Sequence, residues 1–183
     1  MLNREKKIKV VFLGDKGSGK TSLASNFLGT EIERPRLPTI FQNYSTELVR
    51  KDVGYHFSFW DVNSSPKYYK LRSACYKNTD VIVLCFRVND TKMKENLGLW
   101  LKEIEHLGNI PVILCGTGGD ERNQRTETFE GMKRLTQNLG CTKYIETSKY
   151  SKQSVESLRS EIIKLNEKRH GGIFRFCNFC SCC

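Results

Sequence analysis

Apolar and polar residues follow two rhythms along the chain, and these rhythms predict strands and helices in turn. Six short apolar runs are typical of strands. They cover residues 8–13, 45–51, 55–60, 81–86, 111–115 and 143–146. Five segments with a helical period cover residues 20–28, 67–76, 91–106, 126–139 and 151–168. This order predicts an α/β fold with a six-stranded, mostly parallel sheet and helices on both faces.

The predicted strand order brings several polar loops to one edge of the sheet. Val53-Gly54 divides the second strand from the third, so we expect an antiparallel hairpin there. Ligands of such sheets bind beyond the carboxyl ends of the strands. The first strand would deliver residues 14–21 to that edge, the third Asp61, the fifth residues 117–120, and the sixth Thr147 and Ser148. Four loops are therefore expected to converge on one site.

Length and charge indicate one domain with a short tail. A chain of 183 residues with 38% hydrophobic content can bury one core. We expect a domain at residues 1–169, a Cys-rich tail at 170–183, and a monomer. The net charge is +10, but the basic residues are spread along the chain and become denser only near the C-terminus. This distribution favours an anionic membrane over nucleic acid as partner, with a solvated surface as the alternative.

Targeting signals and cysteines indicate a cytosolic protein. Residues 4–7 are all charged and interrupt any N-terminal apolar signal, and no run of about eighteen apolar residues occurs. Four cysteines lie singly in apolar or helical settings, and we expect them to be reduced core thiols. They are Cys75, Cys85, Cys115 and Cys141.

A glycine-rich motif follows the first apolar run directly. It reads Gly14-Asp15-Lys16-Gly17-Ser18-Gly19-Lys20-Thr21 and continues at Ser22 into a helical segment. It fits G-x-x-x-x-G-K-[ST] at every fixed position, in the required strand-loop-helix context. Backbone N–H groups and the positive helix end would surround a phosphate chain, Lys20 would reach its β and γ phosphates, and Thr21 would hold Mg²⁺. The alternative is a plain glycine-rich turn.

The order of motifs resembles the small GTPases, and within them the Rho family. The string Leu37-Pro38-Thr39-Ile40-Phe41-Gln42-Asn43-Tyr44 stands in the place of switch I, and Trp60-Asp61 opens switch II. The resemblance runs from about residue 8 to residue 168. It implies a P-loop G domain that binds GTP or GDP with Mg²⁺, contacts effector proteins through the segment from Leu37 to Tyr44, and meets exchange factors.

The resemblance assigns metal-binding roles to two further residues. Thr39 would place its hydroxyl on Mg²⁺ and its backbone amide on the γ phosphate, while Asp61 would hold Mg²⁺ through water. A switch segment held only by these groups would order with GTP and relax without it. The alternatives are an ordinary loop threonine and a carboxylate that caps a turn.

Two departures from the family concern GTP hydrolysis. Lys16 stands where the family has glycine, next to the γ phosphate and to the arginine that an activating partner supplies. Ser64 and Ser65 replace the glycine and the water-orienting glutamine of Asp-x-Ala-Gly-Gln-Glu. Lys16 should exclude the arginine, and serine is too short to position a water. The string Ser65-Pro66-x-Tyr68-Tyr69 also resembles the Rnd subgroup, which is regarded as GTP-loaded and deficient in hydrolysis. Alternatively, Lys16 pairs with a carboxylate and another residue positions the water.

The base-recognition motifs are also altered. Asn/Thr-Lys-x-Asp appears as Thr117-Gly118-Gly119-Asp120, which keeps the carboxylate for the guanine edge and loses the lysine that packs along the base. Ser-Ala-Lys appears as Ser148-Lys149-Tyr150, where a backbone amide contact to guanine does not depend on side-chain type. Ile32 aligns with the aromatic that covers the base. We expect weaker guanine binding, faster exchange and, between Asp120 and Glu146, no room for the helix that most Rho proteins insert.

The C-terminal segment reads as a lipid anchor. Cys180-Ser181-Cys182-Cys183 fits a prenylation signal loosely and also resembles the doubly prenylated Rab ending, while Cys177 or Cys180 would suit palmitoylation. A second chain or a basic patch usually supports one lipid. The alternatives are a zinc knuckle and solvent-exposed thiols. We expect the protein at the cytosolic face of a membrane.

Three hypotheses follow for the function. The first is an atypical Rho-like GTP-binding protein that hydrolyses GTP slowly or not at all and presents residues 37–44 to effectors. The second is a pseudo-GTPase scaffold that binds partners independently of nucleotide. The third is a P-loop phosphotransferase, which is disfavoured because no Arg-rich lid or substrate-binding insertion is visible between the helices.

Overall fold

The computed structural model describes residues 4–29, 40–120 and 127–170. The described strands form one six-stranded sheet in the order β2-β3-β1-β4-β5-β6. Only β2 runs antiparallel to its neighbour, and it forms the expected hairpin with β3. The strands are β1 (Arg4–Leu13), β2 (Phe41–Arg50), β3 (Val53–Val62), β4 (Val81–Arg87), β5 (Val112–Thr117) and β6 (Lys143–Thr147).

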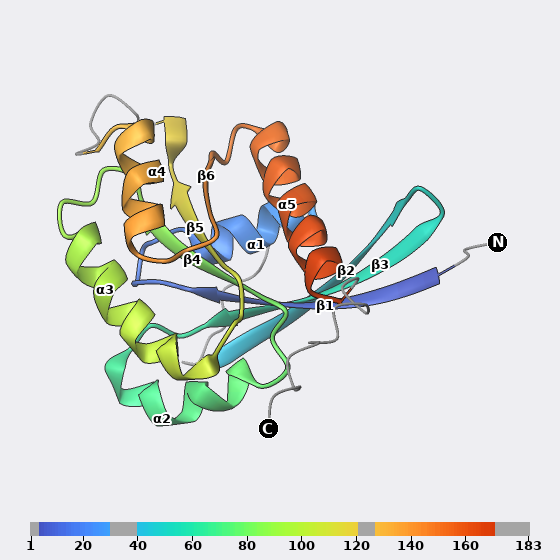
Figure 1. Ribbon diagram of the computed structural model, residues 1–183, viewed down its shortest axis with the longest axis horizontal. Helices are drawn as coiled ribbons and strands as arrows, with labels where there is room; N and C mark the ends of the chain where they lie inside the picture. The colour runs from blue at the N-terminus through green and yellow to red at the C-terminus, as the bar shows by residue number, and fades with distance from the viewer. Residues whose placement is uncertain (1–3, 30–39, 121–126, 171–183) are drawn as a thin grey trace, which may run out of the picture.

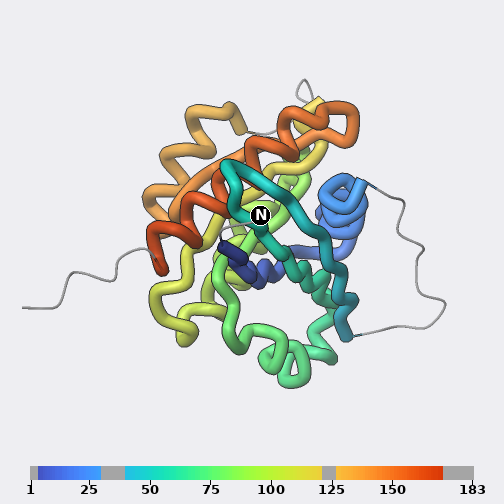
Figure 2. Tube along the Cα trace, turned by 90° about the vertical axis from the view of Figure 1, so that its right-hand side faces the viewer, coloured from blue at the N-terminus to red at the C-terminus, as the bar shows by residue number. Residues whose placement is uncertain are grey.

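Helices cover both faces of the sheet (Figure 1). They are α1 (Lys20–Leu28), α2 (Tyr69–Arg72), α3 (Met93–Ile104), α4 (Phe129–Asn138) and α5 (Lys152–His170). Residues of α1 and α5 pack on one face in a core that includes Phe12, Phe27 and Phe59. Residues of α3 and α4 pack on the other face. Figure 2 shows β1 in the middle of the molecule, with the helices arranged around it. The predicted α/β fold is confirmed.

The buried centre of the sheet explains why the strand predictions succeeded there. In β4, every residue from Val81 to Phe86 is buried, and alternate side chains enter the two cores. A continuous apolar run is typical of a parallel strand covered on both faces. The strand β1 begins earlier than its apolar run, because its polar first half pairs with β3 from Arg4 onward. There, Lys6 and Tyr55 both bond Glu167 of α5, at 2.8 and 2.7 Å.

The segment after β3 differs from the predicted single helix over residues 67–76. A 3-10 turn (Pro66–Tyr68), the short α2 and a second 3-10 turn (Ser73–Tyr76) replace it. The Ser73 hydroxyl donates to the Lys70 carbonyl over 2.7 Å, and such local bonds compete with regular helix geometry. The predicted helix over residues 91–106 likewise ends in a 3-10 turn at Glu105–Leu107.

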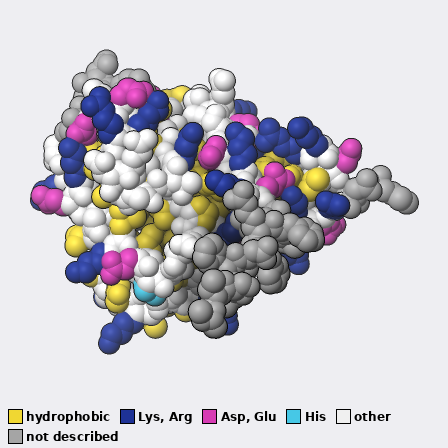
Figure 3. Space-filling model, viewed as in Figure 1, with side chains coloured by type: hydrophobic (Ala, Val, Ile, Leu, Met, Phe, Trp, Pro, Cys, Tyr) yellow, Lys and Arg dark blue, Asp and Glu magenta, His cyan; other side chains and the backbone are white. Residues whose placement is uncertain are grey.

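The last helix, α5, fixes its end to the start of β4. Arg169 donates to the Thr79 carbonyl at 2.9 Å, and His170 Nε2 lies 2.8 Å from Asp80 Oδ1. Basic residues also suit a helix C-terminus, where the dipole end is negative. None of the described helices is long and apolar enough to cross a membrane. On the side of the molecule shown in Figure 3, Lys and Arg side chains are scattered among acidic ones.

Candidate nucleotide-binding site

The loop between β1 and α1 packs so closely that side chains would not fit at two of its glycines. A Cβ at Gly14 would lie 2.0 Å from the Cys85 carbonyl oxygen, and one at Gly19 would lie 2.7 Å from Thr117 Oγ1. Both residues also have positive φ, 132° and 85°, a region that glycine adopts most readily. No side chain caps α1, so its first amides and positive dipole end face the loop. This backbone fits an anion such as phosphate.

Lys20 lies under this loop and is only 8% exposed. Its Nζ donates to the carbonyl oxygens of Gly14 and Asp15, both at 2.7 Å, and more weakly to Ser18 Oγ at 3.3 Å. Burial lowers the pKa of Lys20, although the nearby Asp61 charge opposes that shift. A buried ammonium needs a counter-charge. Its third proton has the longest contact, so it is the one that a phosphate oxygen would take.

Thr21 and Asp61 form a pair of oxygen ligands beside the loop. The Thr21 hydroxyl donates to Asp61 Oδ2 over 2.6 Å. Asp61 lies near the end of β3 and is 9% exposed. Burial raises its pKa, while the Thr21 bond and the Lys20 charge lower it. Mg²⁺ prefers oxygen ligands and keeps several waters, so this donor set fits Mg²⁺. The other predicted ligand, Thr39, lies outside the described residues.

Two contacts that the sequence did not reveal brace the phosphate loop. Trp100 of α3 donates its indole N–H to Asp15 Oδ1 over 3.1 Å. Thr117 donates to the Ser18 carbonyl at 2.8 Å, and the Phe86 carbonyl lies 3.2 Å from the same hydroxyl. The first residue of the predicted base motif therefore supports the phosphate loop from below. A tryptophan in an amphipathic helix is expected to be a core residue, so the sequence gave no signal that Trp100 would bond Asp15.

The base-recognition residues also come together, in a cavity of about 90 Å³ at the carboxyl ends of β5 and β6. The Ser148 hydroxyl bonds the Asp120 carboxylate and lowers its pKa, and the charges of Lys149 and Arg87 act in the same direction. Asp120 is thus kept as an acceptor. The cavity is lined by Gly19, Ser22, Leu23, Asn26, Arg87, Thr117, Gly118, Asp120, Thr147, Ser148 and Lys149.

Arg87 and Asn26 are lining residues that the motif analysis missed. Arg87 is the last residue of β4. A charged residue directly after an apolar strand is the signal that identified Asp61, and it would have identified Arg87 as well. Ile32, the predicted cover of the base, lies outside the described residues.

The segment that carries Ser64 and Ser65 is held by one buried arginine. Arg72 donates to the backbone carbonyls of Ser65 and Asn63, at 2.9 and 3.3 Å. Its guanidinium also bonds Glu103 of α3 over 2.6 Å, and both side chains are less than a tenth exposed. In the same segment, Asn63 Oδ1 accepts from the Ser65 amide at 2.9 Å.

The residues at the predicted hydrolytic positions, Ser64, Ser65 and Lys16, are all at least partly exposed to solvent. Ser64 and Ser65 are half-buried, and Lys16 is exposed. The backbone of residues 63–65 is thus engaged by Arg72 and Asn63, while Lys16 is an exposed residue of the phosphate loop. The predicted hydrolysis positions do lie around the phosphate loop, at the carboxyl ends of β1 and β3.

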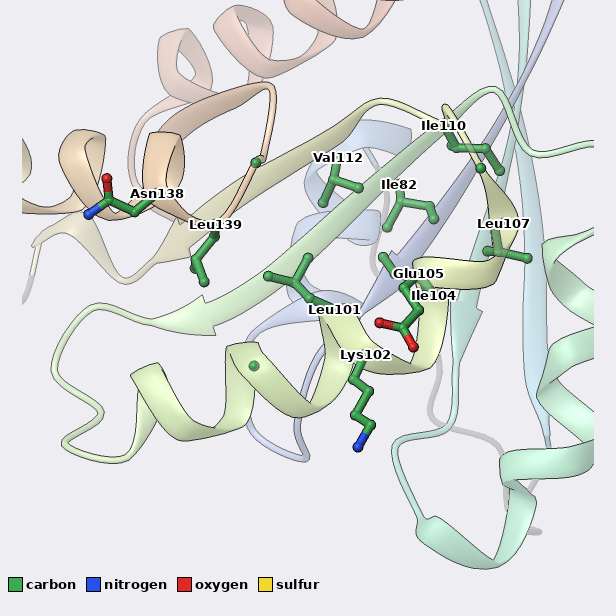
Figure 4. Close-up of a pocket in the computed structure, with 13 residues that line it drawn as sticks. Ile82, Leu101, Lys102, Ile104, Glu105, Leu107, Ile110, Val112, Asn138 and Leu139 are labelled. Atoms are coloured by element: carbon green, nitrogen blue, oxygen red, sulfur yellow. The ribbon is translucent and has the colours of Figure 1, made fainter.

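Another cavity in the described part of the chain lies elsewhere. It measures about 570 Å³ and sits between α3 and the start of β5. Figure 4 shows the apolar side chains of Ile82, Leu101 and Val112 gathered around it. It is lined by residues near the amino ends of β4 and β5, away from the phosphate loop. No cluster of three or more metal-ligating side chains occurs within the described ranges.

Comparison with known proteins agrees with this geometry. The Ras family model matches residues 9–168. The chain is 34% identical over 154 residues to the Ras-like GTP-binding protein RHO1 of Entamoeba histolytica, a match that covers 82% of this chain and 72% of the relative. It is 27% identical over 168 residues to the Ras-like GTP-binding protein RhoL of Drosophila melanogaster, covering 88% of each. The matched span contains the phosphate loop, Asp61 and both base-binding loops, and the chain belongs to the Ras family of small GTPases.

Proposed function

We propose that this protein is an atypical Rho-like switch protein that holds GTP with Mg²⁺ and hydrolyses it slowly or not at all. The observation that carries the proposal is a complete phosphate cradle beside a segment whose hydrolytic positions have changed. Lys20 is buried under the glycine loop. Ser65 is held through its backbone by Arg72 and offers only a short hydroxyl.

Each retained residue has a binding role in this proposal. The glycine loop and the start of α1 surround the phosphates with N–H groups. Lys20 bonds the β and γ phosphate oxygens as a point charge. Thr21 and Asp61 hold Mg²⁺, which neutralises phosphate charge when bound. Asp120 accepts from the guanine edge, and the backbone near Lys149 completes the base contacts.

The changed residues account for slow hydrolysis. A water must be oriented for attack, and a serine at position 65 is too short to do so. In related GTPases the partner's arginine contributes about 10³ to 10⁵ in rate. The exposed Lys16 side chain stands on the loop where that arginine would enter. Losing both devices leaves hydrolysis at or below the slow intrinsic level.

A pseudo-GTPase scaffold is the second candidate, and one observation favours it. The Lys20 ammonium is bonded by Gly14, Asp15 and Ser18, and the Thr21 hydroxyl by Asp61. The cradle thus satisfies its own buried polar groups. A fold that needs no ligand for this purpose would stay stable without nucleotide.

Nucleotide content separates the two candidates. The full chain is purified with Mg²⁺, its folding is checked by circular dichroism, and released nucleotides are quantified after denaturation. The switch proposal expects close to one GTP or GDP per chain, with GTP predominating. A folded sample that is empty, and that takes up no added GTP with Mg²⁺, would replace it with the scaffold.

Effectors would contact the start of β2 in this proposal. Phe41 is 39% exposed and stacks on Trp60, with ring centroids 4.6 Å apart. Phe41 belongs to the segment from Leu37 to Tyr44, of which residues 37–39 lie outside the described ranges, and the stack gives this segment an apolar surface. Exchange factors would act on the same edge of the site. Phe41→Ala should weaken GTP-dependent capture of a partner and leave nucleotide content unchanged.

The tail would anchor the protein to the cytosolic face of a membrane; its first residue, His170, ends α5, and residues 171–183 lie outside the described residues. Its four cysteines and three phenylalanines follow directly on the basic end of α5. One lipid chain anchors only marginally, so basic residues near an anionic surface would assist it. Replacing Cys180, Cys182 and Cys183 with serine should move the protein into the soluble fraction of cells. Unchanged membrane association would contradict lipid anchoring.

A further inference from the structure

Arg87 reaches the base-binding cavity from a strand that carries no base-recognition motif. It is the last residue of β4 and pairs in register with Thr117 of β5. It therefore lies at the carboxyl edge of the sheet, directly beside the loop that contains Asp120. Arg87 is half-buried and lines the same cavity as Asp120 and Lys149.

The alternation of side chains along β4 determines the side of the sheet on which Arg87 lies. Val83 and Cys85 enter the core under α1 and α5, while Leu84 and Phe86 enter the core under α3. Because strand residues alternate between faces, Arg87 lies on the same face of the sheet as Val83 and Cys85. Ser22 and Asn26 of α1 line the cavity on that same side.

A bound purine needs more than the Asp120 carboxylate. Asp120 can satisfy only the polar edge of the base, and the flat faces of the ring must be covered as well. Between Thr117 and Asp120, the β5 loop has no side chain for this, because both positions are glycines, Gly118 and Gly119. Gly118 also has φ 73°, where a larger residue would be strained. Among the described residues, face contact must therefore come from a neighbouring element.

We propose that Arg87 lays its guanidinium group against one face of the bound guanine base. This inference rests on the proposed nucleotide binding. It adds a contact that contributes affinity for the base and does not distinguish guanine from other purines. The planar, charged guanidinium of arginine stacks well on aromatic faces. The Ser148 hydrogen bond, and after it the charges of Lys149 and Arg87, lower the pKa of Asp120 and keep its carboxylate ionised. The arrangement separates the two tasks: Asp120 reads the edge and Arg87 holds the face.

Affinity measurements with two bases test this division. Dissociation constants are measured for ribose-labelled fluorescent GDP and IDP, which differ only by the 2-amino group that Asp120 contacts. Arg87→Ala should weaken both about tenfold and equally, as expected for loss of one stacking contact. Asp120→Ala should weaken GDP more than IDP. Arg87→Lys keeps the charge but loses the plane, and should fall between Arg87→Ala and the natural protein.

The control is Arg134→Ala, which removes the same charge from the exposed side of α4 and should leave both constants unchanged. Thermal melts confirm that each variant is folded. Unchanged or tighter GDP binding in Arg87→Ala would overturn the inference, and so would a loss confined to GDP. If the natural protein binds neither nucleotide, the proposed function itself fails. That result is distinct from binding that does not respond to Arg87.

Discussion

The phosphate loop and the segment at residues 63–65 flank the same site, but they are built in opposite ways. The phosphate loop directs its backbone toward the ligand space, and glycines at 14 and 19 leave no room for side chains. The other segment has its backbone engaged from within, because Arg72 bonds the carbonyls of Asn63 and Ser65. The backbone of the phosphate loop is available to a ligand, whereas the backbone of residues 63–65 is hydrogen-bonded to Arg72 within the protein.

This difference explains how binding and cleavage can be separated. Phosphate contacts made by backbone N–H groups and one lysine persist as long as the loop geometry persists. Water positioning depends on a single long side chain, which one substitution removes. Under the proposed function, this chain keeps the backbone-based part and has lost the side-chain-based part.

The largest expected effect comes from removing Arg72, which holds the segment at residues 63–65. Arg72→Ala removes a partner of the buried Glu103 and leaves its charge uncompensated. Breaking such a pair costs about 3 to 5 kcal/mol of stability. Urea unfolding should show this loss, while Arg134→Ala on the exposed side of α4 should change stability by less than about 0.5 kcal/mol. A loss below about 1 kcal/mol would mean that Arg72 does not hold the segment.

Removing the buried Lys20 side chain tests whether the phosphate loop binds phosphate. Lys20→Ala should weaken GDP and GTP affinity about a hundredfold, because charge-assisted bonds to phosphate are lost. Lys133→Ala is the control, since it removes a lysine at an exposed position of α4, away from the phosphate loop. It should leave affinity within about threefold, because it removes no buried charge. Equal effects of both variants would show that the loop does not bind phosphate as described.

Chelation of Mg²⁺ tests the Thr21–Asp61 pair. EDTA should accelerate release of bound nucleotide about 10- to 100-fold in the natural protein, because phosphate charge is no longer neutralised. Asp61→Ala should release nucleotide quickly with or without EDTA. Stopped-flow fluorescence of labelled GDP gives both rates. Asp61→Ala that remains sensitive to EDTA would place the metal on other ligands.

Restoring the hydrolytic residues should have the smallest of these effects. Lys16→Gly with Ser64→Gly and Ser65→Gln should raise single-turnover GTP hydrolysis about tenfold, within the range that a positioned catalytic group contributes. The gain is limited because Arg72 still constrains residues 63 and 65. Lys16→Gly alone serves as control and should change the intrinsic rate little. An unchanged rate in the triple variant would show that these residues do not limit hydrolysis.

The sequence was a good guide wherever structure depends on neighbours along the chain. The six strands, the β2–β3 hairpin and the glycine loop all have local causes, in period, turn residues and backbone freedom. The convergence of Asp61, Thr117, Asp120 and Ser148 also followed, because parallel strands bring their carboxyl ends to one edge. The four single cysteines are free and buried, as expected. The predicted tail and switch threonine lie outside the described residues and stay predictions.

Only the tertiary structure decided which distant side chains meet. Trp100 lies 85 positions from Asp15, and Glu103 lies 31 positions from Arg72. No local pattern specifies such pairs, because they depend on how α3 packs against the sheet. Arg87 joined the base cavity for the same reason, through the register of β4 with β5. Backbone preferences act over a few residues and can be read in order, whereas buried charge pairing depends on distances that exist only after the helices have packed.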